Sequence, residues 1–434
     1  MRIAILGYGA EGKALADYFK GQKVDITICD ENEQITISET FSRRVGKEAF
    51  KDLKDFDVVF KSPGVPNEKI DKNANITSLT QYFYEQCPCP IIAVTGTKGK
   101  GTTSTLLYEM LKEAGEDVYL GGNIGTPPLE FLNKLTKDSV VVLETSSFQA
   151  ESLKQSPQTA VILMVTEDHL DHHGTLEAYH RAKANLVQFQ NEEDVVIVNK
   201  DYPASIKIAD ISKAQKKIVS TQKEVTTGAC IENGKVVLKK NGEATVIMDT
   251  EEIGMVGAHN IENVLAAMTA ADHYGVTTQA MKRVATSFKG LPHRLEWVKE
   301  EEGVQYFNDS FAVNPSSSIA AIKAFAKPVI LLAGGFDRGL DFTEWAKICV
   351  QGAHVKQIIL LGDNAAPRMH EALKNQKETR DSLVIVRVAN LSEGIIQAKK
   401  AAERGEVVVL SPGCASFDEF KNYKERGEAF KQLV

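Results

Sequence analysis

The chain has 434 residues, of which 43% are hydrophobic and 25% are charged, and its formal net charge at pH 7 is −7. This length predicts a globular protein of two or three domains. An acidic balance without a block of lysines and arginines argues against a nucleic-acid-binding protein. No signal peptide is evident, no apolar run approaches the ~20 residues that cross a bilayer, and the six scattered cysteines are expected to be free thiols. We therefore expect a cytoplasmic protein that does not insert into membranes.

Residues 1–30 predict a strand, a glycine turn, a helix and a second strand. The turn is GYGAEG (7–12), and Asp30 ends the second strand. Backbone N–H groups at the start of such a helix bind diphosphates, and a carboxylate at the end of the next strand approaches a ribose or base. The pattern favours a nucleotide-diphosphate site over a packing turn, but NAD and UDP present the same diphosphate.

A second glycine cluster follows CPCP (87–90), which we interpret as a linker. The strand IIAV (91–94) leads into TGTKGKGTT (95–103) and then into a helix. This arrangement predicts a loop around the phosphates of ATP, with Lys100 near the terminal phosphates. It departs from the strict P-loop at Val94 and at Gly101, where that pattern has a glycine and a hydroxyl residue. A lysine-bearing helix cap is the alternative interpretation.

Two predicted buried strands, 140–146 and 160–166, carry possible metal ligands toward their carboxyl ends. Glu144 sits at the end of VVVLE (140–144), and TEDHLDHH (166–173) follows VILMV (161–165). Such ligands at the carboxyl ends of parallel strands would face the phosphate loop, and oxygen ligands suit Mg²⁺. By itself the histidine and aspartate run could be a solvated loop. Zinc is a further possibility that no cysteine or regularly spaced helix supports.

The remaining chain predicts further elements. Residues 191–256, with Asn-Gly turns at 233–234 and 241–242, predict a small antiparallel insertion. A helix is expected at 259–274 and a hinge at GLPHR (290–294). Strands then alternate with helices to the end, which predicts a third α/β region.

Many short segments together resemble one family, the Mur ligases. They are GYGAEG, SPGV (62–65), TGTKGKGTT, GGNIGTP (121–127), ETSSFQ (144–149), VTEDHLDHHG (165–174), YHRAK (179–183), GAHNIEN (257–263), GLPHR, NDS (308–310), AGGFDRGLDF (333–342) and SPGCASFDEFKNYKERGEAF (411–430). Their order and spacing cover essentially the whole chain. The resemblance implies an α/β protein with a Rossmann-like domain at 1–89, a central P-loop-type ATPase domain at 90–291 and a Rossmann-like C-terminal domain at 292–434.

The resemblance also implies a reaction in peptidoglycan precursor synthesis. ATP would activate the carboxylate of UDP-N-acetylmuramoyl-L-alanine as an acyl phosphate, which the amine of D-glutamate then attacks. Two Mg²⁺ ions are implied as well. We expect a monomer, although the sequence itself does not report the oligomeric state.

The family's functional residues correspond to four groups in this chain. ATP binding is implied for Gly96, Thr97, Lys98, Gly99, Lys100, Gly101, Thr102, Thr103, Asn260, Asn263, Arg294 and Asp309. The UDP-muramoyl substrate is implied at Ala10, Glu11, Asp30, Ser62, Pro63, Gly64, Asn123, Ser146 and Gln149. The amino acid is implied at Arg338, Ser416 and Tyr423, and metal binding at Thr102, Glu144, His169 and Lys183. Lys100, His169 and Lys183 are the implied catalytic residues.

Lys183 resembles the lysine that this family carbamylates with CO₂, which turns an ammonium into an anionic oxygen ligand for Mg²⁺. Without the resemblance it would be interpreted as a surface lysine of a helix. Gly101 lacks a metal-binding hydroxyl, and Phe311 and Val313 stand where relatives often have lysine and threonine. A buried Arg338 would replace a lysine and hold a carboxylate through two hydrogen bonds.

Other functions remain open at this stage. GYGAEG and Asp30 also fit a nicotinamide-dependent oxidoreductase, although that leaves the lysine-bearing loop unexplained. Gly101 and Phe311 would fit a nucleotide-binding regulator without activity. Folate polyglutamate ligases share the central motif but lack the N-terminal glycine cluster and the SPGCASFDEF segment, and other Mur ligases fit that segment poorly.

Overall fold

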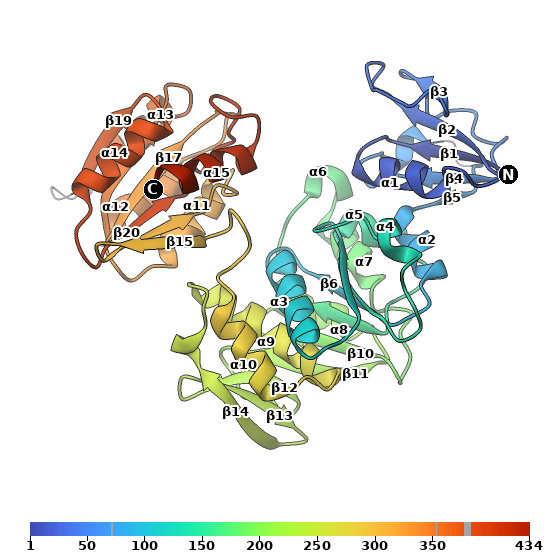
Figure 1. Ribbon diagram of the computed structural model, residues 1–434, viewed down its shortest axis with the longest axis horizontal. Coiled ribbons are helices and arrows are strands. Elements are labelled where there is room, and N and C mark those ends of the chain that lie inside the picture. The colour runs from blue at the N-terminus through green and yellow to red at the C-terminus, as the bar shows by residue number, and fades with distance from the viewer. Residues whose placement is uncertain (71–72, 353, 377–382) are drawn as a thin grey trace. The chain divides into compact units, whose positions relative to one another are not determined.

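The chain divides into two compact units in a computed structural model that describes residues 1–70, 73–352, 354–376 and 383–434 (Figure 1). Unit 1 comprises Met1–Glu252 and Ile261–Ala285, and unit 2 comprises Ile253–Asn260 and Thr286–Val434. Within the described ranges, no helix has the length and apolar character needed to span a membrane.

Unit 1 begins with a five-stranded parallel sheet in the order β3-β2-β1-β4-β5. Its strands are β1 (Arg2–Leu6), β2 (Asp25–Asp30), β3 (Ser42–Val45), β4 (Val58–Lys61) and β5 (Ile76–Thr77), with helices α1 (Ala10–Phe19), η1 (Asn67–Lys69) and α2 (Leu79–Gln86). The strand, turn, helix and strand predicted for residues 1–30 are confirmed. This strand order reverses beside β1, and ligands bind at such switch points, outside the carboxyl ends of the strands.

A nine-stranded sheet forms the rest of unit 1, in the order β14-β13-β12-β11-β10-β9-β6-β8-β7. Its strands are β6 (Ile91–Thr95), β7 (Val118–Gly122), β8 (Val140–Glu144), β9 (Thr159–Ile162), β10 (Val195–Asn199), β11 (Gln215–Ser220), β12 (Gly228–Glu232), β13 (Lys235–Lys240) and β14 (Glu243–Asp249). The helices are α3 (Lys100–Glu113), α4 (Leu129–Leu132), α5 (Ser147–Ala150), α6 (Leu170–His173), α7 (Leu176–Ala184), α8 (Pro203–Ala209), η2 (Thr250–Glu252), α9 (Ala258–His273) and α10 (Thr278–Ser287). The start of α9, to Asn260, and the end of α10, from Thr286, belong to unit 2.

The predicted antiparallel insertion is only partly right. β12, β13 and β14 pair antiparallel, and both hairpin turns have Asn and Gly at positive φ, as two-residue turns require. However, β10 and β11 pair parallel with their neighbours and extend the main sheet instead of forming a separate insertion. Fully buried strands such as β10 find partners through tertiary packing, which the local sequence pattern does not specify.

One continuous core joins the two sheets of unit 1. Ile5 of the first sheet, Phe83 of α2 and Phe131 of α4 belong to the same buried cluster, together with Val141 of β8. The rings of Phe83 and Phe131 meet edge to face, with centroids 5.8 Å apart. Apolar side chains from both sheets are therefore removed from water together.

Unit 2 contains a six-stranded sheet in the order β15-β16-β20-β17-β18-β19, with only the edge strand β15 antiparallel to its neighbour. The strands are β15 (Glu296–Glu301), β16 (Val304–Asn308), β17 (Val329–Gly334), β18 (Val355–Leu361), β19 (Val384–Val388) and β20 (Val407–Leu410). The helices are α11 (Pro315–Lys323), α12 (Thr343–Gln351), α13 (Ala366–Lys374), α14 (Leu391–Ala401) and α15 (Tyr423–Leu433). The predicted third α/β region is confirmed, and the exact domain limits at 89 and 291 stay a prediction.

Candidate functional site

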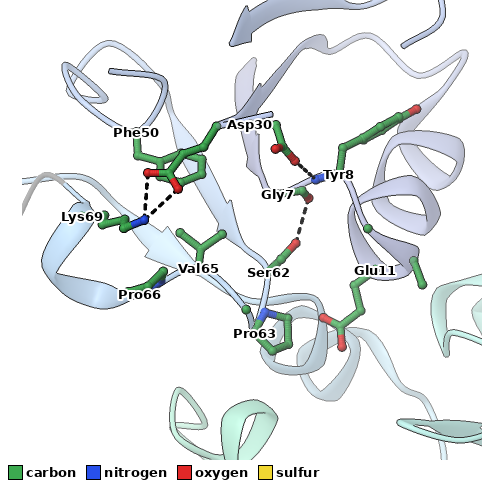
Figure 2. Close-up of a pocket in the computed structure, with 14 residues that line it drawn as sticks. Gly7, Tyr8, Glu11, Asp30, Phe50, Ser62, Pro63, Val65, Pro66 and Lys69 are labelled. Atoms are coloured by element: carbon green, nitrogen blue, oxygen red, sulfur yellow. Dashed lines mark hydrogen bonds and ion pairs between the residues drawn. The ribbon is translucent and has the colours of Figure 1, made fainter. Parts of the chain in front are cut away.

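A cavity of about 490 Å³ opens at the carboxyl ends of β1, β2 and β4 (Figure 2). Its lining is Gly7, Tyr8, Gly9, Ala10, Glu11, Asp30, Glu31, Phe50, Ser62, Pro63, Gly64, Val65, Pro66 and Lys69. Six of the predicted UDP-site residues lie together in this lining: Ala10, Glu11, Asp30, Ser62, Pro63 and Gly64.

Hydrogen bonds and close packing hold the glycine turn of this cavity in place. The Asp30 carboxylate accepts a hydrogen bond from the Tyr8 N–H at 2.8 Å, and the Ser62 hydroxyl donates to the Gly7 carbonyl at 2.9 Å (Figure 2). A Cβ atom at Gly12 would lie 2.1 Å from the Gly7 carbonyl oxygen. Only glycine therefore permits this close approach of helix α1 to the turn.

Glu11 is a buried acid at the start of α1. Its Oε1 accepts a hydrogen bond from the Gln149 side chain at 2.7 Å, whereas Oε2 has no hydrogen-bond partner among the described residues. Burial raises the pKa of the Glu11 carboxyl group, and the bond from Gln149 opposes this effect in part. The contact brings two predicted substrate residues together although 138 positions separate them in the chain.

Sequence reasoning missed Phe50 and Lys69, which also line the cavity. Lys69 lies in η1, and its ammonium group is 2.7 Å from the Glu31 carboxylate. Lys69 thus lines the same cavity as the glycine turn. Its position after SPGV was the available signal, but a single lysine in a polar segment is too common to be diagnostic.

The predicted phosphate loop connects β6 to α3. Gly99, which directly precedes α3, has φ of 89°, and a Cβ atom there would lie 2.3 Å from Asn263 Oδ1. Thr103 in the first turn of α3 donates a hydrogen bond from its hydroxyl to the same Asn263 oxygen at 3.2 Å. The Thr97 hydroxyl lies 2.9 Å from the Tyr179 hydroxyl, and Lys98 is exposed. Glycine and a buried amide therefore shape the loop together.

Two lysines converge on this loop. Lys100 donates hydrogen bonds to the carbonyls of Gly96 and Thr97, each at 3.1 Å. Lys183 of α7 donates to the same Gly96 carbonyl at 2.9 Å and to the Thr95 hydroxyl at 3.3 Å. One backbone carbonyl thus receives hydrogen bonds from two amino groups of α3 and α7.

Lys183 is 1% exposed, so its interpretation as a surface lysine is wrong. Burial lowers the pKa of its amino group well below the ordinary value, and the nearby Lys100 charge lowers it further. A buried amine beside another cation favours the neutral, nucleophilic form.

The predicted metal ligands follow neighbouring strands. Glu144 ends β8 and is 4% exposed, and its Oε1 accepts a hydrogen bond from the Asn123 side chain at 2.8 Å. Glu144 lies beside Val94 of β6 in the sheet register, next to the start of the phosphate loop. His169 follows β9, directly precedes α6 and is exposed, whereas Thr102 in the first turn of α3 is half-buried. Thr102 and His169 therefore follow β6 and β9, and Glu144 ends β8; these three strands are adjacent in the sheet, and the role of the three residues as metal ligands stays a prediction.

The segment after Glu144 is shaped by its own polar side chains. Ser146 caps α5 by accepting a hydrogen bond from the Gln149 N–H, and the Gln149 side chain accepts one from the Ser146 N–H. This capping box is readable from the sequence. It orients Gln149, whose amide group then reaches Glu11.

The other predicted contacts lie in unit 2. Asp309 follows β16, and its carboxylate accepts hydrogen bonds from the Ser411 hydroxyl at 2.7 Å and the Leu295 N–H at 3.1 Å. Burial raises the pKa of Asp309 to about 7, an effect that these two bonds oppose. Arg294 stacks on the Phe311 ring at 3.9 Å, and Phe311 meets Tyr423 edge to face at 4.8 Å. Phe311 therefore connects a predicted nucleotide residue with a predicted amino-acid residue.

Arg338 is exposed, which corrects the expectation that it is buried. Its guanidinium lies 5.3 Å from the centre of the Phe417 ring. It follows β17 in a loop, and stacking on an aromatic face leaves its N–H groups in solvent. Ser416, another predicted amino-acid residue, is 2% exposed. Asn260, a predicted ATP residue in unit 2, donates a hydrogen bond to the Val256 carbonyl at 2.7 Å.

Arg426 of α15 is a buried residue that sequence reasoning missed. Its guanidinium donates hydrogen bonds to the carbonyls of Ser310, Cys414 and Ala415 and to the Ser310 hydroxyl, all within 2.9–3.0 Å. These bonds connect the loop after β16 with the loop after β20, which carries Ser416. Only the packing of α15 against both loops distinguishes this arginine from exposed ones.

Comparisons with known proteins agree with this arrangement. Residues 94–271 match the family described as Mur ligase middle domain, and residues 293–414 match the Mur ligase, glutamate ligase domain. The UDP-N-acetylmuramoylalanine--D-glutamate ligase of Ruminiclostridium cellulolyticum is 35% identical, over 100% of this chain and 96% of that protein. The Clostridium tetani enzyme of the same name is also 35% identical over the same shares of the two chains.

Solved structures share the fold at low sequence identity. The UDP-N-acetylmuramate-alanine ligase MurC of Thermotoga maritima has a TM-score of 0.61 at 16% identity, covering 100% of this chain and 98% of that one. FolC of E. coli has a TM-score of 0.59 at 18% identity, covering 82% and 92%. The fold alone therefore does not separate these ligases, but the full-length sequence identity does: this chain belongs to the Mur ligase family.

Proposed function

We propose that this protein joins D-glutamate to UDP-N-acetylmuramoyl-L-alanine at the expense of ATP, in peptidoglycan precursor synthesis. Relatives with this name align over the whole chain at 34–35% identity. The observation that carries the proposal is the convergence of Lys100, Lys183 and Glu144 at the carboxyl ends of adjacent strands. A nicotinamide-dependent oxidoreductase has no use for this lysine-bearing loop.

The chemistry requires charge neutralisation and positioning. Phosphoryl transfer from ATP to the substrate carboxylate creates an acyl phosphate, and the D-glutamate amine then displaces phosphate through a tetrahedral intermediate. Lys100 would neutralise ATP phosphates, and the backbone N–H groups at the start of α3 would bind them. We assign ATP binding to residues 96–103 and to Asn260, Asn263, Arg294 and Asp309. Lys100, His169 and Lys183 are the catalytic assignments.

Mg²⁺ fits this site on the condition that Lys183 carries no positive charge. The Glu144 carboxylate is an oxygen ligand of the kind Mg²⁺ prefers, and Mg²⁺ would neutralise phosphate charge during transfer. An ammonium at Lys183 would repel the ion. Carbamylation of Lys183 by CO₂ would remove that charge and add carboxylate oxygens, and its lowered pKa supports reaction through the neutral amine. We assign metal binding to Glu144, His169, carbamylated Lys183 and Thr102, which could replace the hydroxyl missing at Gly101.

The cavity at the ends of β1, β2 and β4 is the proposed UDP site. The glycine N–H groups would present partial positive charges to the diphosphate, and the Lys69 ammonium would present a full positive charge. Glu11 lines the same cavity, and burial raises the pKa of its carboxyl group. Asn123, Ser146 and Gln149 would contact the muramoyl arm. Arg338, Ser416 and Tyr423 would hold D-glutamate. The exposed Arg338 would move off the Phe417 ring and pair with a carboxylate of D-glutamate.

Further properties belong to the same proposal. We divide the chain into a UDP domain at 1–89, an ATPase domain at 90–291 and an amino-acid domain at 292–434. Free cysteines throughout the described chain favour a reducing, cytoplasmic location. We expect a monomer without nucleic-acid partners.

The decisive assay measures phosphate release with ATP, Mg²⁺ and UDP-N-acetylmuramoyl-L-alanine against a panel of amino acids. D-glutamate should support turnover well above L-glutamate, D-aspartate and L-lysine. Equal rates with an uncharged amino acid would refute the specificity while leaving the ligase reaction intact. No phosphate release with any amino acid would refute the ligase function itself.

A further inference from the structure

Three side chains near, but distinct from, the proposed Mg²⁺ ligands form a compact group. Glu151 immediately follows α5, and His172 and His173 form the last turn of α6. One potential ligand atom from each residue lies within 4.8 Å of the other two. His172 Nε2 and Glu151 Oε2 are 3.4 Å apart.

This geometry suits a tetrahedral transition metal. Zn–N bonds of about 2.0–2.1 Å in a tetrahedral site place neighbouring ligand atoms about 3.4 Å apart. The separation between His172 Nε2 and Glu151 Oε2 matches this value, and the ligand atom of His173 lies within 4.8 Å of both. Two imidazoles with one carboxylate favour Zn²⁺ or Co²⁺ over Mg²⁺, which prefers oxygen ligands.

The surrounding residues hold the group in position. Phe148 packs against both imidazoles, with ring centroids 4.3 Å and 5.5 Å apart, and the Ser147 hydroxyl lies 3.0 Å from His173 Nε2. The Asn185 side chain donates to the Glu151 carbonyl at 3.0 Å. Such contacts orient metal ligands and reduce the ordering that binding requires.

The site is also accessible from solvent. The side chains of His172 and Glu151 are 19% and 32% exposed, so an ion can reach them from solvent.

We propose that Glu151, His172 and His173 bind one transition-metal ion of the Zn²⁺ class, with solvent completing the coordination. This site is separate from the proposed Mg²⁺ ligands and does not depend on the ligase reaction. It connects the end of α5 to α6, whose preceding residue is His169. Occupancy would therefore restrain the segment that carries a proposed Mg²⁺ ligand.

Metal titration of the tag-free protein tests the proposal. Calorimetry with Zn²⁺ and visible absorption with Co²⁺, both without nucleotide, should show one tight equivalent that excess Mg²⁺ does not displace. Glu151→Gln and His172→Phe, whose ring can still pack on Phe148, should weaken binding about 10- to 100-fold or more. Zn²⁺ should raise the melting temperature of the wild type and not of these variants.

His169→Ala separates this site from the proposed Mg²⁺ site, and His273→Gln is a control outside both. Each should bind Zn²⁺ as the wild type does. Wild-type affinity in both Glu151→Gln and His172→Phe would overturn the proposal, and so would loss of binding in His169→Ala. Melting curves without metal show whether each variant is folded. Ligase assays are not part of this readout, so a failed ligase proposal remains distinguishable.

Discussion

Asp309 should make the stability of unit 2 fall as pH rises. Its pKa is about 7 in the folded protein and 3.8 ordinarily, so the folded state holds its proton more tightly than the unfolded state. The stability that this proton contributes is complete below pH 3.8 and is lost as pH rises through about 7. A difference of about three pKa units lowers the free energy of unfolding by about 4 kcal/mol in total. About 2.5 kcal/mol of this loss occurs between pH 5 and pH 8. Because Asp309 as a residue is only half-buried, solvent screening makes this an upper value.

Asp309→Asn isolates the effect. The amide can accept from the Leu295 N–H and donate to the Ser411 hydroxyl, so both hydrogen bonds survive while the titration disappears. The free energy of unfolding of the variant, relative to wild type, should rise by up to about 2.5 kcal/mol from pH 5 to pH 8.

Urea denaturation of the ligand-free protein, followed by tryptophan fluorescence, measures this difference. Both tryptophans of the chain, Trp297 and Trp345, belong to unit 2, so the signal reports on the unit that contains Asp309. Asp363→Asn removes a carboxylate whose side chain is 89% exposed and serves as the control. The same pH dependence of the free energy of unfolding in wild type and Asp309→Asn would refute the reasoning. A free energy of unfolding of the variant that falls relative to wild type as pH rises would also refute it.

Three further predictions concern the proposed active site. Lys183→Ala should lower turnover at least about 10- to 100-fold, and added acetate should restore part of it by supplying a carboxylate; full activity without acetate would contradict the carbamate. Gly99→Ala should weaken ATP binding and cost about 1–2 kcal/mol or more in stability, because it adds a clash with Asn263 to the strain of positive φ. Gly115→Ala is the matched control in calorimetry and melting, since it has φ of 90° but open space, and equal effects of the two substitutions would exclude the clash. Arg338→Ala should raise the KM for D-glutamate about 10- to 100-fold, the equivalent of about 1.5–3 kcal/mol, with ATP affinity unchanged; an unchanged KM would remove Arg338 from the amino-acid site.

The sequence by itself determined the features that depend on neighbouring residues. The Asn-Gly turns at 233–234 and 241–242, the strand, loop and helix around Lys100 and the capping box at Ser146 were readable, because backbone preferences and side chains within a few positions produce them. Family resemblance added proposed roles that no local pattern carries, such as the proposed metal binding by Lys183.

Only the tertiary structure decided which side chains are buried and which distant residues meet. Lys183 is buried because α7 packs it against the loop after β6, whereas its local sequence alone favours a surface lysine. Arg338 was expected to be buried but lies in an exposed loop. The contact between Glu11 and Gln149 and the group of Glu151 with two histidines join separate helices. Burial and such contacts depend on long-range packing, and packing sets the pKa and the ligand geometry on which function rests.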